Sequence, residues 1–247
     1  MLLAQADFFY ITARILLMEI LPGGYTLKIY DGCFPLSTDS MALAYFVRLP
    51  KAARVLDLGA GCGTLGLLLC AQRSDCHVTG IEISEEAHLG ALENIARNNL
   101  SHRMHSICGD LRDPKHFTSG SADVCISNPP YFTGGPAAKL KDARRSDLCT
   151  MEALMSAAGR ALKFGGDFFL VHRPEALGQL FICAGKAALE PKRICLVRHS
   201  NSAPVSLVLV QCRKGAKPGL AWEQISLYNE NGSPSADYMR IYHQQEA

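Results

Sequence analysis

Short apolar runs alternate with amphipathic stretches along most of the chain, and this alternation predicts strands that alternate with helices. Seven core strands are predicted, at residues 54–58, 77–82, 105–108, 123–126, 167–172, 193–199 and 204–212. Helices are predicted at residues 41–47, 64–72, about 85–99 and 151–162, and from Pro174 onward. This order is typical of an α/β fold with a mainly parallel sheet and helices on both faces.

The two ends of the chain are expected to differ from this core. Residues 1–21 are mostly apolar but are interrupted by Asp7, Arg14 and Glu19, which favours an amphipathic packing helix over a signal peptide. The last two core strands leave no room for a helix between them, so we expect an antiparallel hairpin at the sheet edge. We therefore predict one domain over residues 1–247, with a helix and short strand in 1–30, a core in 35–212, and a tail in 213–247 with a short strand at 225–228.

Composition narrows the class of protein. With 48% hydrophobic and 19% charged residues, the chain is globular. Its net charge of +2 does not by itself indicate nucleic-acid binding, so only a local cluster of cations could do so. The ten cysteines form no C-x-x-C pair, which argues against a zinc site and favours a reducing cytoplasm. Neither a bound metal nor a membrane-spanning helix is expected, and we expect a monomer.

Polar side chains stand at or near the ends of four successive predicted strands: Asp57, Glu82, Asp110 and Asn128. In doubly wound sheets, ligands bind beyond the carboxyl ends of the strands. Glu82 is placed to accept both hydroxyls of a ribose, and Asp110 to accept from an adenine amino group. Their alternative role is that of solvated acids at strand ends.

Glycines 59, 61 and 63 lie just after Asp57, with Leu58 between Asp57 and the first of them. They allow a tight turn that brings backbone N–H groups close to a ligand, and the helix N-terminus behind them favours a carboxylate. Their spacing differs from the G-x-G-x-x-G of dinucleotide sites, which disfavours an NAD-type ligand. A ligand with an amino-acid end, a ribose and an adenine would suit this turn and the acids together.

The run Asp-Leu-Gly-Ala-Gly-Cys-Gly at 57–63 resembles the glycine motif of class I methyltransferases, whose cofactor is S-adenosyl-L-methionine. The resemblance continues through Ile81-Glu82-Ile83 and Gly109-Asp110-Leu111, and covers roughly residues 35–212. It implies a Rossmann-like fold and an enzyme that uses S-adenosylmethionine.

Residues 128–131, Asn-Pro-Pro-Tyr, end the fourth core strand with a stiff turn, because each proline lacks an N–H and fixes its own φ. An amine could donate to the Asn128 side-chain oxygen and the Pro129 carbonyl, which would free its lone pair for attack on a methyl group. Tyr131 could stack on the base that carries the amine. An ordinary proline turn is the plainer alternative.

Asn-Pro-Pro-Tyr resembles the motif of methyltransferases that act on planar nitrogen: adenine N6, guanine N2 or a glutamine amide. Many such enzymes carry an additional substrate-binding module, and this chain is too short for one beside its catalytic core. With Phe-Pro-Leu-Ser-Thr-Asp-Ser at 34–40 as well, it resembles the tRNA1(Val) adenine-N6 methyltransferase family, which modifies the adenine beside the anticodon, position 37.

This resemblance implies a tRNA anticodon loop as substrate and Asn128, Pro129, Pro130 and Tyr131 as catalytic residues. The cofactor residues it implies are Thr38, Asp39, Asp57, Gly59, Ala60, Gly61, Gly63, Glu82, Ile83, Asp110, Leu111 and Asn128. Methylation of a protein glutamine or of guanine N2 in ribosomal RNA stays open, as does an RNA-binding protein without turnover.

Two groups of cations are candidates for RNA contact. The first follows the Asn-Pro-Pro-Tyr motif and consists of Lys139, Lys141, Arg144 and Arg145, which could grip phosphates around an extruded base. The second is the segment 193–199 with Arg213, Lys214 and Lys217. Solvated surface charge is the alternative for both.

Overall fold

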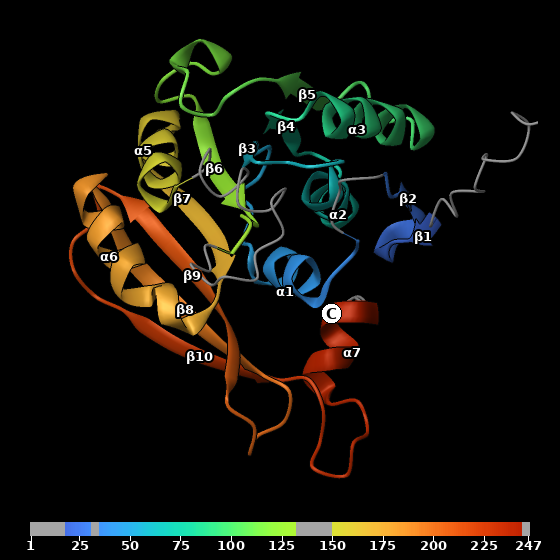
Figure 1. The fold of residues 1–247 in the computed structure, drawn as a ribbon, viewed down its shortest axis with the longest axis vertical. Coiled ribbons are helices and arrows are strands. Elements are labelled where there is room, and N and C mark those ends of the chain that lie inside the picture. The colour runs from blue at the N-terminus through green and yellow to red at the C-terminus, as the bar shows by residue number, and fades with distance from the viewer. Residues whose placement is uncertain (1–17, 31–34, 132–149, 244–247) are drawn as a thin grey trace, which may run out of the picture.

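The computed structural model describes residues 18–30, 35–131 and 150–243. Its centre is an eight-stranded sheet with the strand order β10-β8-β9-β7-β6-β3-β4-β5 (Figure 1). The strands of this sheet are β3 (Arg54–Leu58), β4 (His77–Glu82), β5 (Met104–Cys108), β6 (Ala122–Ser127), β7 (Leu162–His172), β8 (Leu189–Arg198), β9 (Val205–Lys214) and β10 (Ala221–Ser226). The α-helices are α1 (Thr38–Phe46), α2 (Thr64–Gln72), α3 (Glu85–Arg97), α5 (Met151–Ala161), α6 (Leu177–Lys186) and α7 (Ala236–His243).

The five strands from β7 to β5 are parallel, and β9 runs antiparallel between β7 and β8. The mainly parallel sheet and the antiparallel hairpin of β8 and β9 confirm the fold predicted from the sequence. The strand count was wrong by one, because the tail strand joins the sheet as β10. It pairs in parallel with β8 and so covers the hairpin, which is not the sheet edge.

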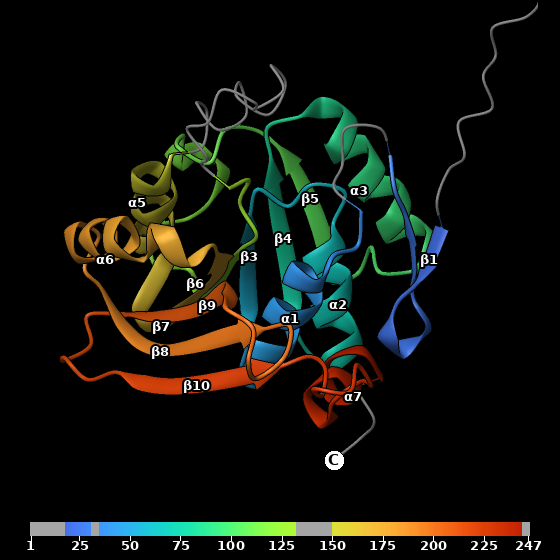
Figure 2. The same ribbon diagram turned by 60° about the horizontal axis from the view of Figure 1, so that its bottom comes forward.

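Helices cover both faces of the sheet, and alternate residues of β3 show the division (Figure 2). Val55 packs in a cluster with α1 and α2, whereas Leu56 and Leu58 pack in a second cluster with α5. Strands buried on both faces must be apolar throughout, which explains the continuous apolar runs in the sequence. Asp57 lies on the Val55 side of the strand.

The predicted N-terminal helix does not extend to Leu21. Residues Met18–Ile20 form strand β1, which pairs antiparallel with β2 (Thr26–Lys28) through a turn at Pro22–Gly24. Gly23 and Gly24 take φ values of 81° and 82°, which suit a hairpin turn between two short strands. A run as short as Met18–Ile20 fits a strand as well as a helix, so its hydrophobic pattern could not distinguish the two. The rest of the predicted helix lies outside the described residues.

Two further 3-10 turns, η2 (Pro114–His116) and η3 (Pro174–Ala176), connect β5 to β6 and β7 to α6. Within the described ranges, no helix has the length and apolarity needed to cross a membrane.

Candidate functional site

The strand-end residues predicted from the sequence lie on adjacent strands. Asp57 on β3 is in register with Gly80 on β4 and with Ile126 on β6, while Glu82 at the end of β4 is in register with Cys108 on β5. The chain order of the strands reverses between β3 and β6, which is where doubly wound sheets open a crevice for ligands.

The glycine turn is hydrogen-bonded to the end of β4. The N–H groups of Gly59 and Ala60 both donate to the Ile81 carbonyl, at 2.9 and 3.1 Å. Glu82 accepts from the Gly61 N–H at 2.9 Å and, through its other oxygen, from the Ser84 N–H at 2.8 Å. Each carboxylate oxygen has a second lone pair, so Glu82 can still accept from a ribose.

The turn leaves open space where a ligand could lie. Gly59 and Gly61 have φ values of 78° and 55°, and a Cβ added at either would meet no heavy atom within 4 Å. Gly63, with a φ of 87°, caps the N-terminus of α2. Empty space next to the N-terminus of α2 is a suitable cradle for the carboxylate end of an amino-acid ligand.

Asp57 is buried at the base of this cradle. Only 1% of its surface is exposed, and its Oδ1 atom has no hydrogen-bond partner among the described residues. Burial, and then the nearby charge of Glu82, raise the pKa of Asp57 to about 8. A buried carboxyl oxygen without a donor fits a ligand that carries an amino group.

The predicted adenine contacts lie at the end of β5. Arg112 donates to both oxygens of Asp110, at 2.9 and 2.8 Å from its Nε, and lowers the pKa of that carboxyl. Leu111 is buried, whereas Ile83, which follows Glu82 in the chain, is 43% exposed. An adenine amino group would therefore share Asp110 with Arg112.

The Asn-Pro-Pro-Tyr motif meets helix α1 at its first turn. Asn128 donates from Nδ2 to Ser40 Oγ at 3.0 Å, which leaves its side-chain oxygen available as an acceptor. Pro129 is buried, and Pro130 and Tyr131 are half-buried. The Tyr131 hydroxyl donates to Asp39 Oδ2. Ser37 caps the helix by accepting from the Ser40 N–H.

Two residues at the end of β7 complete this corner, and we did not predict them. The ring of His172 packs edge-on against Tyr131 at 5.3 Å, and the Arg173 guanidinium lies 4.8 Å from the centre of the Tyr131 ring. Burial raises the pKa of Asp39, whereas the charge of Arg173 lowers it. Polar residues at a fifth strand end, just before Pro174, were the sequence signal that could have revealed them.

Helix α7 from the C-terminal tail lies against α1 in both ribbon views (Figures 1 and 2). The Tyr242 hydroxyl is 2.8 Å from Thr38 Oγ1. A row of rings runs from His199 through Tyr228 and Tyr238 to Tyr242, with centroid separations of 4.6, 5.3 and 4.3 Å, and the last pair is stacked. The tail therefore supports the first turn of α1, next to Asp39.

The first predicted RNA-contacting group, Lys139, Lys141, Arg144 and Arg145, lies outside the described residues. In the described part of the chain, no group of three His, Cys, Asp or Glu side chains could hold a metal ion.

A glycine turn and acids at the ends of β3 to β5, with Asn-Pro-Pro-Tyr at the end of β6, define a class I methyltransferase, which takes its methyl group from S-adenosylmethionine. A family model described as the methyltransferase small domain matches residues 36–180, and the chain belongs to this family. Class and cofactor agree with those predicted from the glycine motif.

Two curated relatives of this chain have the same name. The tRNA1(Val) (adenine(37)-N6)-methyltransferase of Photobacterium profundum is 28% identical over 235 residues, covering 88% of this chain and 95% of that protein. A protein of the same name from Bacteroides fragilis is 31% identical over 186 residues, covering 73% of this chain and 78% of that protein.

A solved structure supports the fold. It is a protein from Agrobacterium tumefaciens described as a predicted O-methyltransferase, which has a TM-score of 0.71 and 20% identity, covering 83% of this chain and 95% of that one.

Proposed function

We propose that this chain transfers a methyl group from S-adenosylmethionine to N6 of adenine 37 in a tRNA. The orientation of Asn128 carries the proposal, because the 3.0 Å bond from its Nδ2 to Ser40 Oγ leaves the side-chain oxygen to accept from an amine. The names of the Photobacterium and Bacteroides relatives support tRNA adenine 37 as the acceptor.

The chemistry asks little of the protein beyond positioning. Bound S-adenosylmethionine supplies an electrophilic methyl group. The Asn128 oxygen and the Pro129 carbonyl would accept the two hydrogens of the adenine amine, whose lone pair is otherwise delocalised into the ring. Tyr131 would hold the extruded base by stacking. No strong base is needed, because the nitrogen becomes acidic once it is methylated.

The cofactor residues keep the roles inferred above. Gly59, Ala60, Gly61 and Gly63 would line the open cradle for the methionine end of S-adenosylmethionine, with its carboxylate at the N-terminus of α2. Asp57 would accept from the amino group of the cofactor through the unpartnered Oδ1. Glu82 and Ile83 would lie at the ribose, and Asp110 and Leu111 at the adenine. Thr38 and Asp39 would line the methionine end, and Asn128 would contact both the cofactor and the acceptor.

We also infer that the enzyme acts in the cytoplasm on the anticodon loop, as a monomer. Seven of the eight cysteines in the described residues are buried, which supports a reducing setting.

Transfer of labelled methyl groups to an unmodified tRNA1(Val) transcript tests the proposal. Nuclease digestion and mass spectrometry should find N6-methyladenine at position 37, and a transcript with guanine at 37 should accept no label. Asn128→Ala should reduce transfer by a factor of at least about 100, in the range seen when an oriented acceptor or donor is removed. Label in guanine, or in a release-factor glutamine and not in RNA, would overturn the proposal.

A further inference from the structure

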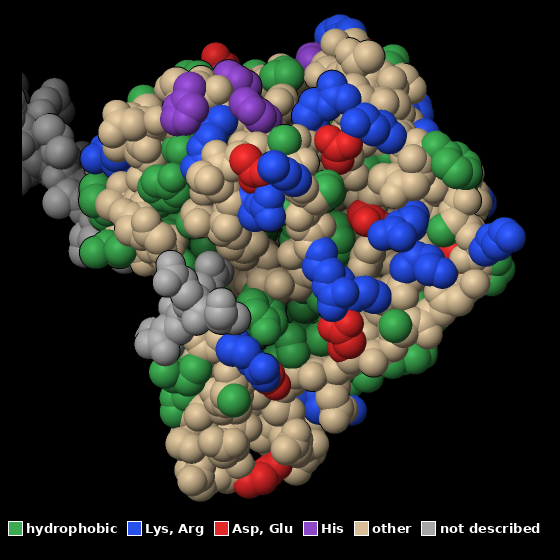
Figure 3. All heavy atoms as spheres, turned by 180° about the vertical axis from the view of Figure 1, so that it is seen from behind, with side chains coloured by type: hydrophobic (Ala, Val, Ile, Leu, Met, Phe, Trp, Pro, Cys, Tyr) green, Lys and Arg blue, Asp and Glu red, His purple; other side chains and the backbone are tan. Residues whose placement is uncertain are grey.

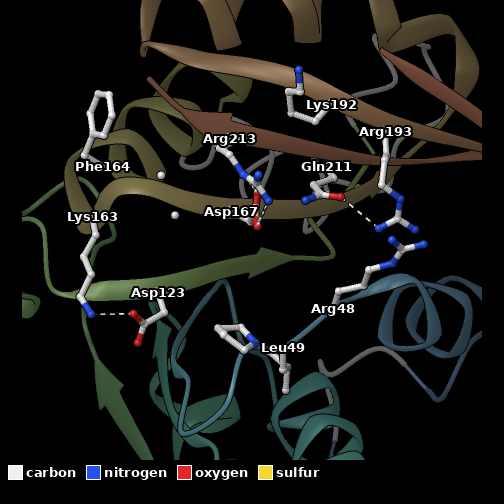
Figure 4. Close-up of a pocket in the computed structure, with 13 residues that line it drawn as sticks. Arg48, Leu49, Asp123, Lys163, Phe164, Asp167, Lys192, Arg193, Gln211 and Arg213 are labelled. Atoms are coloured by element: carbon white, nitrogen blue, oxygen red, sulfur yellow. Dashed lines mark hydrogen bonds and ion pairs between the residues drawn. The ribbon is translucent and has the colours of Figure 1, made fainter. Parts of the chain in front are cut away.

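A basic cleft of about 590 Å³ lies near the ends of the strands that are opposite to the methyl-transfer site. Its lining residues come from the loop after α1, from the starts of β6, β7 and β8, and from the end of β9 (Figure 4). Asp123, near the start of β6, lines the cleft, whereas Asn128 follows the end of the same strand. At about 3.3 Å per residue, roughly 16 Å of strand separate these two residues.

Positive charge exceeds negative charge in this cleft. Its five cations are Arg48, Lys163, Lys192, Arg193 and Arg213. Three carboxylates pair with them: Asp123 with Lys163 at 2.6 Å, Asp167 with Arg213 at 2.8 Å, and Glu223 with Arg193 at 2.9 Å. The view from behind shows Lys and Arg side chains gathered over the middle of this face, around a hollow (Figure 3).

Lys192 has no carboxylate partner among the described residues. Its Nζ atom donates to the Lys217 carbonyl at 3.0 Å, and that bond leaves two further hydrogens for an anion. Arg48 also keeps its charge near solvent, since its side chain is 71% exposed and its nearest acid, Glu223, is 3.7 Å away and is shared with Arg193.

An aromatic ring stands at the rim of the cleft. Phe164 is 82% exposed, and its ring lies over Gly215, where an added Cβ would come within 2.1 Å of it. A phenylalanine so exposed gains nothing from core packing. Exposed rings beside cations are how proteins hold unpaired bases while cations hold the phosphates.

We propose that this cleft is a second RNA-binding site, which holds the sugar-phosphate backbone of the substrate away from its target base. The inference rests on the proposed function, in that RNA is taken as the substrate. The cations are spread over several segments, which suits an extended polyanion. Arg48 and Arg213 are exposed, and the other three cations are half-buried. The separation of roughly 16 Å between cleft and motif is short enough for a folded tRNA to reach both.

Binding of tRNA to the full chain, measured by fluorescence anisotropy over a range of salt concentrations, tests the proposal. The double substitution Lys192→Gln with Phe164→Ala should raise the Kd about tenfold and make the salt slope shallower by about 1, as expected for one lost phosphate contact. The matched control is Lys186→Gln. Lys186 is 62% exposed on α6 and does not line the cleft, and its substitution should change Kd less than about twofold.

An unchanged Kd in the double variant, or an equal loss in the control, would overturn the proposal. So would tight binding of pyrophosphate or ADP that the double substitution abolishes while tRNA affinity stays the same, because the cleft would then serve a small phosphate ligand. Calorimetric binding of S-adenosylmethionine checks that the variants are folded. Methyl transfer is measured separately, so wild-type protein that binds tRNA through the cleft but does not modify position 37 would refute the proposed function alone.

Discussion

The Tyr131 hydroxyl donates a hydrogen bond to Asp39, which joins the end of the Asn-Pro-Pro-Tyr motif to the first turn of helix α1. This one contact therefore joins Tyr131, the ring proposed to stack on the base, to Asp39, which is proposed to line the methionine end of the cofactor site. Asn128 and Ser40 form a second contact between the same two segments. A movement of α1 would therefore disturb the donor and acceptor sides together.

The ring of Tyr131 should matter more than its hydroxyl. We expect Tyr131→Phe to reduce kcat/KM for tRNA about fivefold, because it removes one hydrogen bond worth about 1 kcal/mol. Tyr131→Ala should reduce it about 10- to 100-fold, because it also removes stacking on the base. Steady-state kinetics of the two variants distinguishes these contributions, and equal losses would show that the ring does not stack on the substrate.

Arg173 should control the ionisation of Asp39. Burial raises the pKa of Asp39 and Arg173 lowers it, so Arg173→Ala should raise that pKa further. If ionised Asp39 is required, the acidic limb of the pH profile of kcat/KM should move to higher pH in this variant. Arg173→Lys keeps the charge and is the control. Identical profiles for all three proteins would show that Asp39 does not titrate with activity.

Comparing Gly61→Ala with Gly120→Ala distinguishes two effects of an added Cβ: strain in the backbone, and loss of the space proposed for S-adenosylmethionine. The two glycines have φ values of 55° and 65°, and a Cβ at either position meets nothing within 4 Å. Each substitution should cost about 1–2 kcal/mol of stability, because alanine is strained at positive φ. Only Gly61→Ala should also weaken S-adenosylmethionine binding in calorimetry. Equal cofactor affinity in the two variants would place the ligand elsewhere.

Asp57 should make the protein less stable as the pH rises. Its folded pKa of about 8 lies above its unfolded value of about 3.9, so its stabilising contribution is complete below about 3.9 and is lost as the pH rises to about 8. Asp57→Asn has no charge to bury. Its Tm should therefore fall less than that of the wild type between about pH 6 and 8.5. Each 1 kcal/mol by which the two proteins differ in this loss of unfolding free energy should appear as a difference of about 2–4 °C in Tm.

Calorimetry of the same Asp57→Asn variant should show weaker S-adenosylmethionine binding, since an amide attracts an amino group less than a carboxylate does. A parallel pH dependence of Tm in the two proteins would contradict the buried ionisation. Unchanged cofactor affinity would remove Asp57 from the site.

The sequence predicted those parts of the site that local chemistry determines. Glycines at positive φ, acids at strand ends and a Pro-Pro stop each leave a mark within a few residues. His172, Arg173 and Tyr242 were not predicted, because their roles depend on which distant segments meet at α1. Arg193 and Arg213 stood in the second predicted group of cations, but only the sheet order brings them together with Lys163 and Arg48.

The bond between Thr38 and Tyr242 spans 204 positions of the chain. Ribosomes add about 5–20 residues per second, so roughly 10–40 s separate the synthesis of its two partners. A nascent chain has its glycine turn and acids long before it has the helix that supports the first turn of α1. The site gains this support only after residue 242 has been synthesised, and chains released before that point would lack it.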